Sequence, residues 1–308
     1  MTPRWLTEAD VRASLNALEL IDAMEEALGA FSAGEVAHPV RTAIETGDRS
    51  FFASMPAFYE RRGILGAKLV TITPANAALD LHTHMAAISL FNSKTGELLA
   101  VMDGRYITEV RTAAVSAVSV RHLARANAET LAILGSGVQA RSHAALLPGF
   151  RKIRTWSPTR ANLEAFAAEV GAEATATAEE AVHGADVVVV ATNAVTPAIV
   201  NEWVEPGAHV IAMGACRPNQ REVDPTLTAR ARLIVDSRDA ALRESGDIVM
   251  SIREGYFTEA HVAAELGEVV RGVRPGRTSD SEVTLFKSLG LAIEDLVAAE
   301  IAYRNFSA

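Results

Sequence analysis

Apolar residues in the first third of the chain change their spacing once. They recur at helical intervals over 18–31, which predicts a helix there. Thr7 and Asp10 have the spacing of a capping box, so a shorter helix is expected to begin near Glu8. Alternating apolar and polar positions then predict five strands: 41–45, 50–55, 65–72, 85–92 and 98–102. A long alanine-rich helix over 107–123 completes an α+β region with antiparallel pairing.

From residue 129 onward, short apolar runs alternate with helical patterns. The runs predict buried strands at 130–134, 153–156, 187–191, 209–213 and 233–235. Helices are expected to begin near Val138, Arg160, Thr177, Pro225 and Arg238. This alternation is typical of a doubly wound parallel sheet. We therefore predict an α/β fold, with an α+β domain over 1–124, a Rossmann-type domain over 125–280 and a helix within 281–308 that returns to the first domain.

A glycine-rich segment gives the clearest chemical signal. It reads Gly-Ser-Gly-Val-Gln-Ala over 135–140 and directly follows the predicted strand 130–134. A turn of this kind, between a buried strand and a helix, brings backbone N–H groups and a helix N-terminus to a pyrophosphate. The sequence therefore predicts a dinucleotide site whose contacts include Gly135, Gly137, Val138 and Gln139.

The end of the second strand of this domain favours NADPH over NADH. An acidic residue at that point would bind the ribose 2′-hydroxyl and repel a 2′-phosphate. The chain instead has Ser157, Thr159 and Arg160, and no carboxylate lies among them. Arginine binds phosphate through paired N–H donors. The alternative is that Thr159 and Arg160 only begin a helix and that NADH is used.

Composition excludes several other classes of protein. The chain has 308 residues, of which 49% are hydrophobic, so it can bury a full core. Its net charge of −9 and the lack of a basic cluster argue against nucleic-acid binding. Cys216 is the single cysteine, which excludes an internal disulfide and indicates a reducing compartment. We find no apolar signal core and no apolar run near the roughly 20 residues of a membrane helix, so a cytoplasmic protein without a membrane partner is expected.

Several segments together resemble the ornithine cyclodeaminase/mu-crystallin family, in order along nearly the whole chain. They are 38–42, 66–70, 101–104, 107–114, the glycine-rich turn, 214–218 and 286–290. The resemblance is closest to the ketimine reductase branch. It implies a Rossmann domain that holds the nucleotide, and a second domain, made of the N-terminal third and the C-terminal helix, that supplies substrate groups and a homodimer interface.

The same resemblance assigns the substrate groups to Arg41, Lys68 and Arg111. The two arginines are expected to clamp a substrate carboxylate and so fix the reacting carbon. Lys68 has apolar neighbours on both sides, which predicts a desolvated ammonium with a lowered pKa. Arg111 interrupts an alanine- and valine-rich helix, where a charge needs a partner, and the substrate carboxylate is one candidate.

Thr83 and His84 match a Ser/Thr-plus-His pair that the family has at the nicotinamide and substrate pocket. His84 is expected to contact the cofactor or supply a proton, and Thr112 is expected at the cofactor. The alternative is a metal site, because strand alternation would put His82 and His84 on one face, with Asp80 at matching spacing. No further cluster in the sequence supports a metal, and none is expected.

Thr192, Met213 and Cys216 are expected to contact the nicotinamide end. Lys287 either approaches the same cleft or is a solvent-facing helix lysine. The family's cyclodeaminases and alanine dehydrogenases resemble Gly-Ala-Asp or Gly-Gly-Asp where this chain has Cys216. A thiol is a poor substitute for a carboxylate, which argues against cyclodeamination. No histidine or asparagine is placed by the sequence to activate Cys216 as a nucleophile.

The resemblance therefore implies hydride transfer from NADPH to the C=N carbon of a cyclic ketimine carboxylate. Δ1-Pyrroline-2-carboxylate, which would give L-proline, and Δ1-piperideine-2-carboxylate, which would give L-pipecolate, are the substrates expected. Three alternatives stay open: an ornithine cyclodeaminase or related amino-acid dehydrogenase, an NADPH-dependent carrier of a small ligand, and a metal hydrolase.

Overall fold

The computed structural model describes residues 2–47, 50–147 and 149–306, so residue 1 and residues 307–308 of the predicted first and last segments lie outside it. The chain divides into two compact units. Unit 1 contains Met1–Thr112 and Gly290–Ala308, and unit 2 contains Ala113–Leu289. Helices and strands are both abundant in the described residues, and the predicted α/β class is confirmed.

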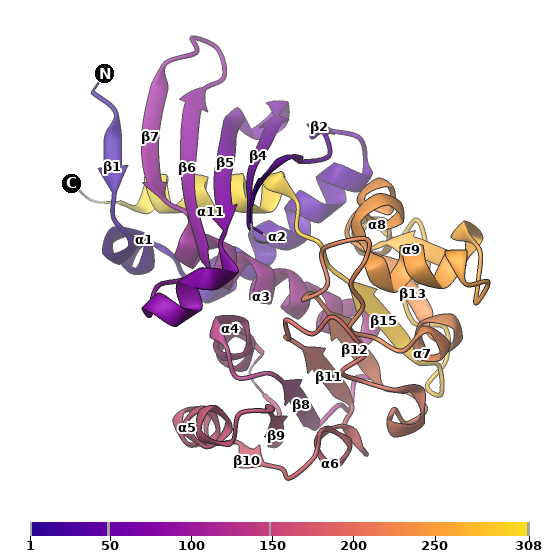
Figure 1. The fold of residues 1–308 in the computed structure, drawn as a ribbon. Helices are drawn as coiled ribbons and strands as arrows, with labels where there is room; N and C mark the ends of the chain where they lie inside the picture. The colour runs from indigo at the N-terminus through magenta and orange to yellow at the C-terminus, as the bar shows by residue number, and fades with distance from the viewer. Residues whose placement is uncertain (1, 48–49, 148, 307–308) are drawn as a thin grey trace. The chain divides into compact units, whose positions relative to one another are not determined.

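Unit 1 is built on a seven-stranded sheet whose main path runs β1-β7-β6-β5-β4-β2, with β3 paired to β4. Apart from the parallel pair β1 and β7, the pairs are antiparallel. Its strands are β1 (Arg4–Leu6), β2 (Val36–Ala37), β3 (Thr42–Gly47), β4 (Ser50–Tyr59), β5 (Ile64–Ile72), β6 (His84–Asn92) and β7 (Leu98–Asp103). The helices α2 (Ala17–Ser32) and α11 (Ala292–Asn305) pack together, and α11 packs on β4, β5 and β6 (Figure 1).

Local signals explain several of these elements. Thr7 and Asp10 form the predicted capping box at the start of α1 (Glu8–Ser14). Residues of β5 alternate between the two faces of the sheet, and the even-numbered ones from Ile64 to Val70 are buried. Gly66 is required in this strand, because a Cβ there would lie 2.2 Å from the backbone oxygen of Ser89.

Unit 2 contains an eight-stranded sheet with the order β10-β9-β8-β11-β12-β15-β13-β14, in which every pair is parallel. Its strands are β8 (Thr130–Leu134), β9 (Lys152–Trp156), β10 (Glu173–Ala174), β11 (Val187–Val190), β12 (His209–Ala212), β13 (Arg232–Val235), β14 (Val262–Glu265) and β15 (Thr284–Lys287). Strand order reverses between β8 and β11, so the sheet has the switch point of a doubly wound fold.

The helices α4 to α10 connect these strands, and α3 links the two units. α3 spans Arg105–Leu123, and the division between the units falls within it, after Thr112. The connecting helices are α4 (Val138–Leu146), α5 (Arg160–Val170), α6 (Ala178–Val182), α7 (Pro225–Arg230), α8 (Arg238–Glu244), α9 (Gly246–Arg253) and α10 (Leu266–Val270).

The helix predicted within 281–308 is wrong in its first part. Residues Thr284–Lys287 form β15 between β12 and β13, and α11 begins only at Ala292. Both faces of β15 are buried, and a fully buried strand cannot be distinguished from a buried helix by periodicity. The units therefore separate at Leu289/Gly290 and at Thr112/Ala113, rather than at the predicted 280/281 and 124/125.

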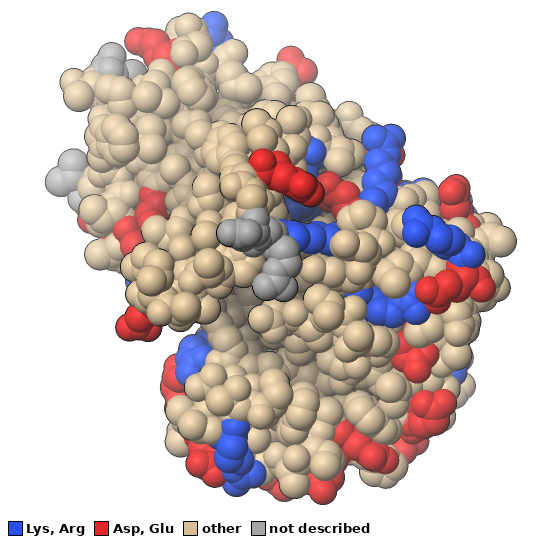
Figure 2. Space-filling view, viewed as in Figure 1, with Lys and Arg blue, Asp and Glu red and all other residues tan. Residues whose placement is uncertain are grey.

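Lys, Arg, Asp and Glu side chains are interspersed on the face drawn in Figure 2. Within the described part of the chain, none of the helices combines the length and the hydropathy needed to cross a bilayer.

Candidate functional site

A buried ion cluster in unit 1 contains the predicted Lys68. Lys68 lies on β5 and its side chain points to the covered face of the sheet, where it is 2% exposed. Its Nζ lies 2.6 Å from Oδ2 of Asp295, which is on α11. The register explains this orientation, because residue 68 shares the buried alternation of Gly66 and Val70.

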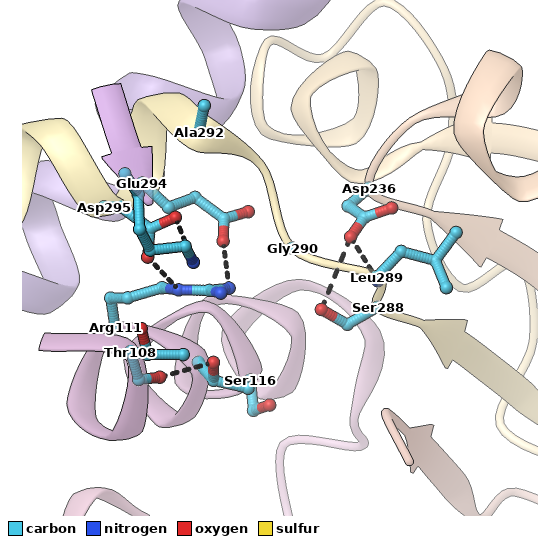
Figure 3. A network of polar contacts seen from close by, with 12 residues as sticks. Thr108, Arg111, Ser116, Asp236, Ser288, Leu289, Gly290, Ala292, Glu294 and Asp295 are labelled. Atoms are coloured by element: carbon cyan, nitrogen blue, oxygen red, sulfur yellow. Dashed lines mark hydrogen bonds and ion pairs between the residues drawn. The ribbon is translucent and has the colours of Figure 1, made fainter. Parts of the chain in front are cut away.

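Arg111 joins the same cluster from α3. Its Nε donates to Oδ1 of Asp295 at 2.9 Å, and its Nη1 donates to Oε2 of Glu294 at 2.6 Å (Figure 3). The partner that the sequence required for this buried guanidinium is therefore a pair of protein carboxylates. Glu294 and Asp295 were not singled out from the sequence, although they interrupt the apolar run 289–302 as conspicuously as Arg111 interrupts its own helix.

The cluster lowers the pKa of both Lys68 and Asp295, for different physical reasons. Burial lowers the pKa of Lys68 to about 8, with Arg111 and Arg41 adding to this effect and Asp295 opposing it. For Asp295, burial raises the pKa, but Arg111 and Lys68 outweigh burial and hold it below its usual value. The predicted lowered pKa of Lys68 is confirmed, and the lysine is able to titrate near neutral pH.

Arg41 approaches this cluster through Gly290. Its Nη2 donates to the backbone oxygen of Gly290 at 3.5 Å, and the side chain is half-buried just before β3. Gly290 has φ +85°, and a Cβ there would lie 2.5 Å from Nη1 of Arg111. Only glycine fits this position, so Arg41 and Arg111 both border the segment that leads into α11.

His84 begins β6 on the same unit. Burial, together with the nearby charges of Lys68 and Arg111, lowers its pKa to about 4. At neutral pH the imidazole is therefore uncharged and offers one donor and one acceptor, rather than a readily released proton.

The alternation predicted for His82 and His84 does not form, because His82 and Thr83 precede the strand and are exposed. The backbone oxygen of Thr83 accepts from the N–H of Thr73 at 2.8 Å. Over residues 2–47, 50–147 and 149–306, no three His, Cys, Asp or Glu side chains gather as a metal site would require. Thr112 is buried, and its hydroxyl donates to the backbone oxygen of Thr108 at 2.7 Å.

In unit 2, the glycine-rich turn joins β8 to α4 as predicted. Gly135 has φ +116°, and a Cβ there would lie 2.3 Å from the backbone oxygen of Ala191. Gly137 is the N-cap of α4 and is exposed, with open space where a Cβ would be and no side-chain hydrogen bond at the cap. Val138 is 42% exposed, and Oε1 of Gln139 is buried without a hydrogen-bond partner among the described residues. A helix start without a side-chain cap, at an exposed glycine, fits an anionic ligand such as a pyrophosphate.

The end of β9 lies beside this turn. The hydroxyl of Ser136 donates to that of Ser157 at 2.9 Å. Thr159 is the N-cap of α5 but makes no side-chain cap hydrogen bond. Arg160 is 65% exposed and pairs with Glu164 at 2.6 Å, one helical turn away. In the carboxylate-free segment predicted at this strand end, Thr159 and Arg160 are thus accessible from solvent, whereas Ser157 is buried.

The loops after β11 and β12 contain Thr192, Met213 and Cys216. Sγ of Cys216 donates to the backbone oxygen of Met213 at 3.3 Å. Lys287 differs from both predictions made for it, since it lies on β15 with no exposed surface and pairs with Glu222 and Asp247. Glu222 and Asp247 were missed in the sequence because neither lies in a motif.

Comparison with known proteins gives matches over the whole chain. The sequence model of the ornithine cyclodeaminase/mu-crystallin family matches residues 1–308. The chain is 42% identical over 315 residues to the ketimine reductase mu-crystallin of Mus musculus, covering 99% of this chain and 98% of the relative. It is 37% identical over 305 residues to a Δ1-pyrroline-2-carboxylate reductase of Bacillus cereus, covering 96% and 94%.

Solved structures agree with these relatives. The Δ1-pyrroline-2-carboxylate reductase of Thermococcus litoralis, in complex with NADH and L-proline, matches with a TM-score of 0.94 and 35% identity, over 98% of this chain and 97% of that one. An archaeal alanine dehydrogenase dimer with bound NAD matches with a TM-score of 0.93 and 33% identity, over 99% and 96%. The chain belongs to the ornithine cyclodeaminase/mu-crystallin family, as its motifs predicted.

Proposed function

We propose that this protein is an NAD(P)H-dependent reductase of a cyclic ketimine carboxylate. The observation that carries the proposal is the buried Lys68, whose pKa lies near 8 beside Arg111 and Arg41. A cyclic imino acid presents a carboxylate and a C=N nitrogen, and this cluster has a cation for the first and a titratable ammonium for the second. The substrates proposed are Δ1-pyrroline-2-carboxylate, giving L-proline, and Δ1-piperideine-2-carboxylate, giving L-pipecolate.

Each residue of the cluster has a distinct task in this reaction. Arg41 and Arg111 hold the carboxylate and so orient the ring, while Lys68 keeps a proton on the imine nitrogen and makes the carbon a better hydride acceptor. Glu294 and Asp295 keep Arg111 and Lys68 in place. The nicotinamide supplies the hydride when it is bound.

The cofactor proposed is NADPH, held by Gly135, Gly137, Val138 and Gln139 at its pyrophosphate. Ser157, Thr159 and Arg160 would take the 2′-phosphate, since residues 157–160 include no carboxylate, and Arg160 would exchange its exposed pair with Glu164 for the phosphate. Thr83, His84, Thr112, Thr192, Met213 and Cys216 remain the proposed neighbours of the nicotinamide. A carboxylate is absent at position 216, which favours reduction of an imine over release of ammonia from ornithine or alanine.

We also propose a homodimer that forms through the uncovered face of the unit 1 sheet. Odd-numbered residues of β5 point away from α11, and Leu69 among them is 43% exposed. Ile44, on β3, and Met85, on β6, are 59% and 49% exposed on the same face by register. Exposed apolar side chains that share one sheet face would be covered by a second copy of the same face. We assign the enzyme to the cytoplasm, where its single Cys216 would stay reduced.

Absorbance at 340 nm tests the proposed reaction. Purified protein, NADPH and Δ1-pyrroline-2-carboxylate are expected to give a rapid loss of absorbance near neutral pH, and the piperideine substrate compares the ring sizes. A stable signal in the presence of bound NADPH would contradict the reductase and favour a carrier of a small ligand.

A further inference from the structure

Unit 2 buries a second ion cluster, outside the substrate groups. Nζ of Lys287 lies 2.8 Å from Oδ2 of Asp247 and 3.3 Å from Oε1 of Glu222. All three side chains are at most 1% exposed. Burying three charges is unfavourable unless each is paired and hydrogen-bonded. Hydrophobic residues of similar volume in their place would often stabilise the fold equally well. The cluster therefore calls for an explanation beyond stability.

Glu222 joins two loops at the carboxyl edge of the parallel sheet. Its Oε1 accepts hydrogen bonds from the backbone N–H groups of Gly214 at 2.5 Å and Ala215 at 3.1 Å, both after β12. Its Oε2 accepts from the hydroxyl of Thr192 at 3.1 Å, which follows β11. Ligands of open α/β sheets bind at this edge. A single carboxylate thus fixes two of the loops that a dinucleotide would meet.

The other two charges hold Glu222 itself. Oδ1 of Asp247 accepts from the backbone N–H groups of Glu222 at 2.8 Å and Val223 at 3.0 Å. Burial raises the pKa of Glu222, while Lys287 and the two loop N–H groups oppose this and Asp247 adds to it. Lys287 thereby favours the ionised carboxylate, which has only acceptors to offer to the surrounding donors.

The backbone of Gly214 packs closely against the loop after β11 and against Glu222. A Cβ at residue 214 would lie 1.8 Å from the backbone oxygen of Thr192 and 2.5 Å from Oε2 of Glu222. Gly246 is equally confined, since a Cβ there would lie 1.9 Å from the backbone oxygen of Gln220. Because the packing is this close, a displacement of Glu222 would also displace the loops after β11 and β12.

We propose that Glu222, held by Lys287 and Asp247, is a positioning residue for the nicotinamide end of the cofactor. It sets the hydroxyl of Thr192 and the backbone of Gly214 and Ala215, while the adenosine end depends on the separate turn after β8 and the end of β9. This inference rests on the proposed dinucleotide-dependent function and adds residues that do not themselves touch the cofactor.

Binding measurements on Glu222→Gln test the inference without any substrate. The dissociation constant of NADPH, or of NADH if the wild type binds it more tightly, is compared with that of the matching ADP-ribose fragment, which lacks nicotinamide. Glu222→Gln is expected to raise the dissociation constant of the dinucleotide at least tenfold and to shift the fluorescence of the bound dihydronicotinamide. The dissociation constant of the fragment is expected to change less than twofold. Asp247→Asn changes the support of Glu222 and replaces no proposed cofactor neighbour. It provides the same test if Glu222→Gln does not fold, and is expected to weaken binding of the dinucleotide, but not of the fragment, by about threefold.

Asp186→Asn is the matched control. Oδ2 of Asp186 accepts from the backbone N–H groups of Glu129 and Thr130, both at 2.9 Å, at the amino edge of the same sheet. Its loss is expected to lower the thermal unfolding midpoint with less than a twofold change in either dissociation constant. Equal weakening of dinucleotide and fragment by Glu222→Gln, or no weakening of either, would overturn the inference. Failure of the wild type to bind dinucleotide or fragment would instead contradict the proposed function.

Discussion

Each unit buries one lysine among carboxylates, yet the pKa of the two lysines is shifted in opposite directions. Lys68 has Asp295 as its direct partner and two arginines nearby, and burial with those cations brings its pKa to about 8. Lys287 lies between Asp247 and Glu222, and although burial lowers its pKa, the two carboxylates raise it well above the ordinary value. The ratio of cations to anions, rather than burial, separates the two sites.

The difference distinguishes a site for chemistry from a structural support. The unit 1 cluster combines the cations Lys68, Arg111 and Arg41 with the two carboxylates Glu294 and Asp295. The unit 2 cluster has one cation and two carboxylates, which accept backbone N–H donors. A lysine that titrates near working pH can exchange a proton, whereas a permanently charged lysine can only hold its neighbours.

Among the variants that test this comparison, Lys68→Met is expected to have the largest effect. Loss of the titratable ammonium is expected to lower kcat by about 100-fold to 10,000-fold, the usual range for a general acid, with the dissociation constant of NADPH nearly unchanged. The steady-state rate of NADPH oxidation measures kcat. Lys152→Met is the control, because Lys152 is 54% exposed and forms a surface pair with Glu173. A kcat within threefold of the wild type would remove Lys68 from the mechanism.

Asp295→Asn is expected to affect both stability and pH dependence. It leaves Lys68 and Arg111 without their shared anion, which should cost about 3–5 kcal/mol in unfolding free energy. Since Asp295 raises the pKa of Lys68, its loss should also move the pH above which kcat/KM falls from near 8 to a lower value.

Glu300→Gln, on the same helix, is the control for Asp295→Asn. Glu300 is 26% exposed and pairs with Arg62 at 2.8 Å, so its loss should cost at most about 1 kcal/mol. Urea unfolding and a pH profile measure both variants. An unchanged alkaline limb in Asp295→Asn would contradict the coupling of Asp295 to Lys68.

Arg41→Ala tests whether the charge of Arg41 binds the substrate or stabilises the fold. Because the hydrogen bond from Arg41 to Gly290 is long and the side chain is only half-buried, KM for the ketimine carboxylate should rise about tenfold to 100-fold, or about 1.5–3 kcal/mol, with little change in the unfolding midpoint. Arg111→Ala should raise KM and also destabilise the protein, because Glu294 and Asp295 would lose this partner. Equal KM values for Arg41→Ala and wild type would remove Arg41 from the clamp.

Arg160→Asp has the smallest expected effect and concerns the cofactor alone. It should weaken the binding of NADPH about tenfold, which is at the lower end of the range for loss of a hydrogen bond to a charged group. The binding of NADH should not become weaker. Arg151→Asp is the control, since Arg151 is 77% exposed and lies before β9. The ratio of kcat/KM for the two cofactors is the readout, and a ratio that does not change in Arg160→Asp would contradict the 2′-phosphate assignment.

Features with a local cause were predicted well from the sequence. The strand at 130–134 matches β8 to the residue, because an apolar run followed by glycines defines both of its ends. β15 was predicted as part of a helix because its neighbours, β12 and β13, come from distant parts of the chain and bury both of its faces. A one-dimensional pattern contains no information about that insertion.

The candidate site, like the fold, could be predicted only in part from the sequence. Lys68 and Arg111 were identified because a charge inside an apolar pattern is itself a local signal. Their partners were not, since Arg111 and Asp295 are 184 residues apart in the sequence and only the fold brings them together. Glu222 and Lys287 likewise meet across 65 residues.

The titration of the lysines tests the central comparison most directly. The chain contains only four lysines, and Lys94 and Lys152 are exposed, so the resonances of ¹³Cε-labelled lysine can be assigned by substitution. We expect one resonance, absent in Lys68→Met, to titrate with a midpoint near pH 8, while that of Lys287 stays in its protonated form well above that pH. A midpoint for Lys68 at or above the ordinary lysine value of about 10.4 would contradict the account.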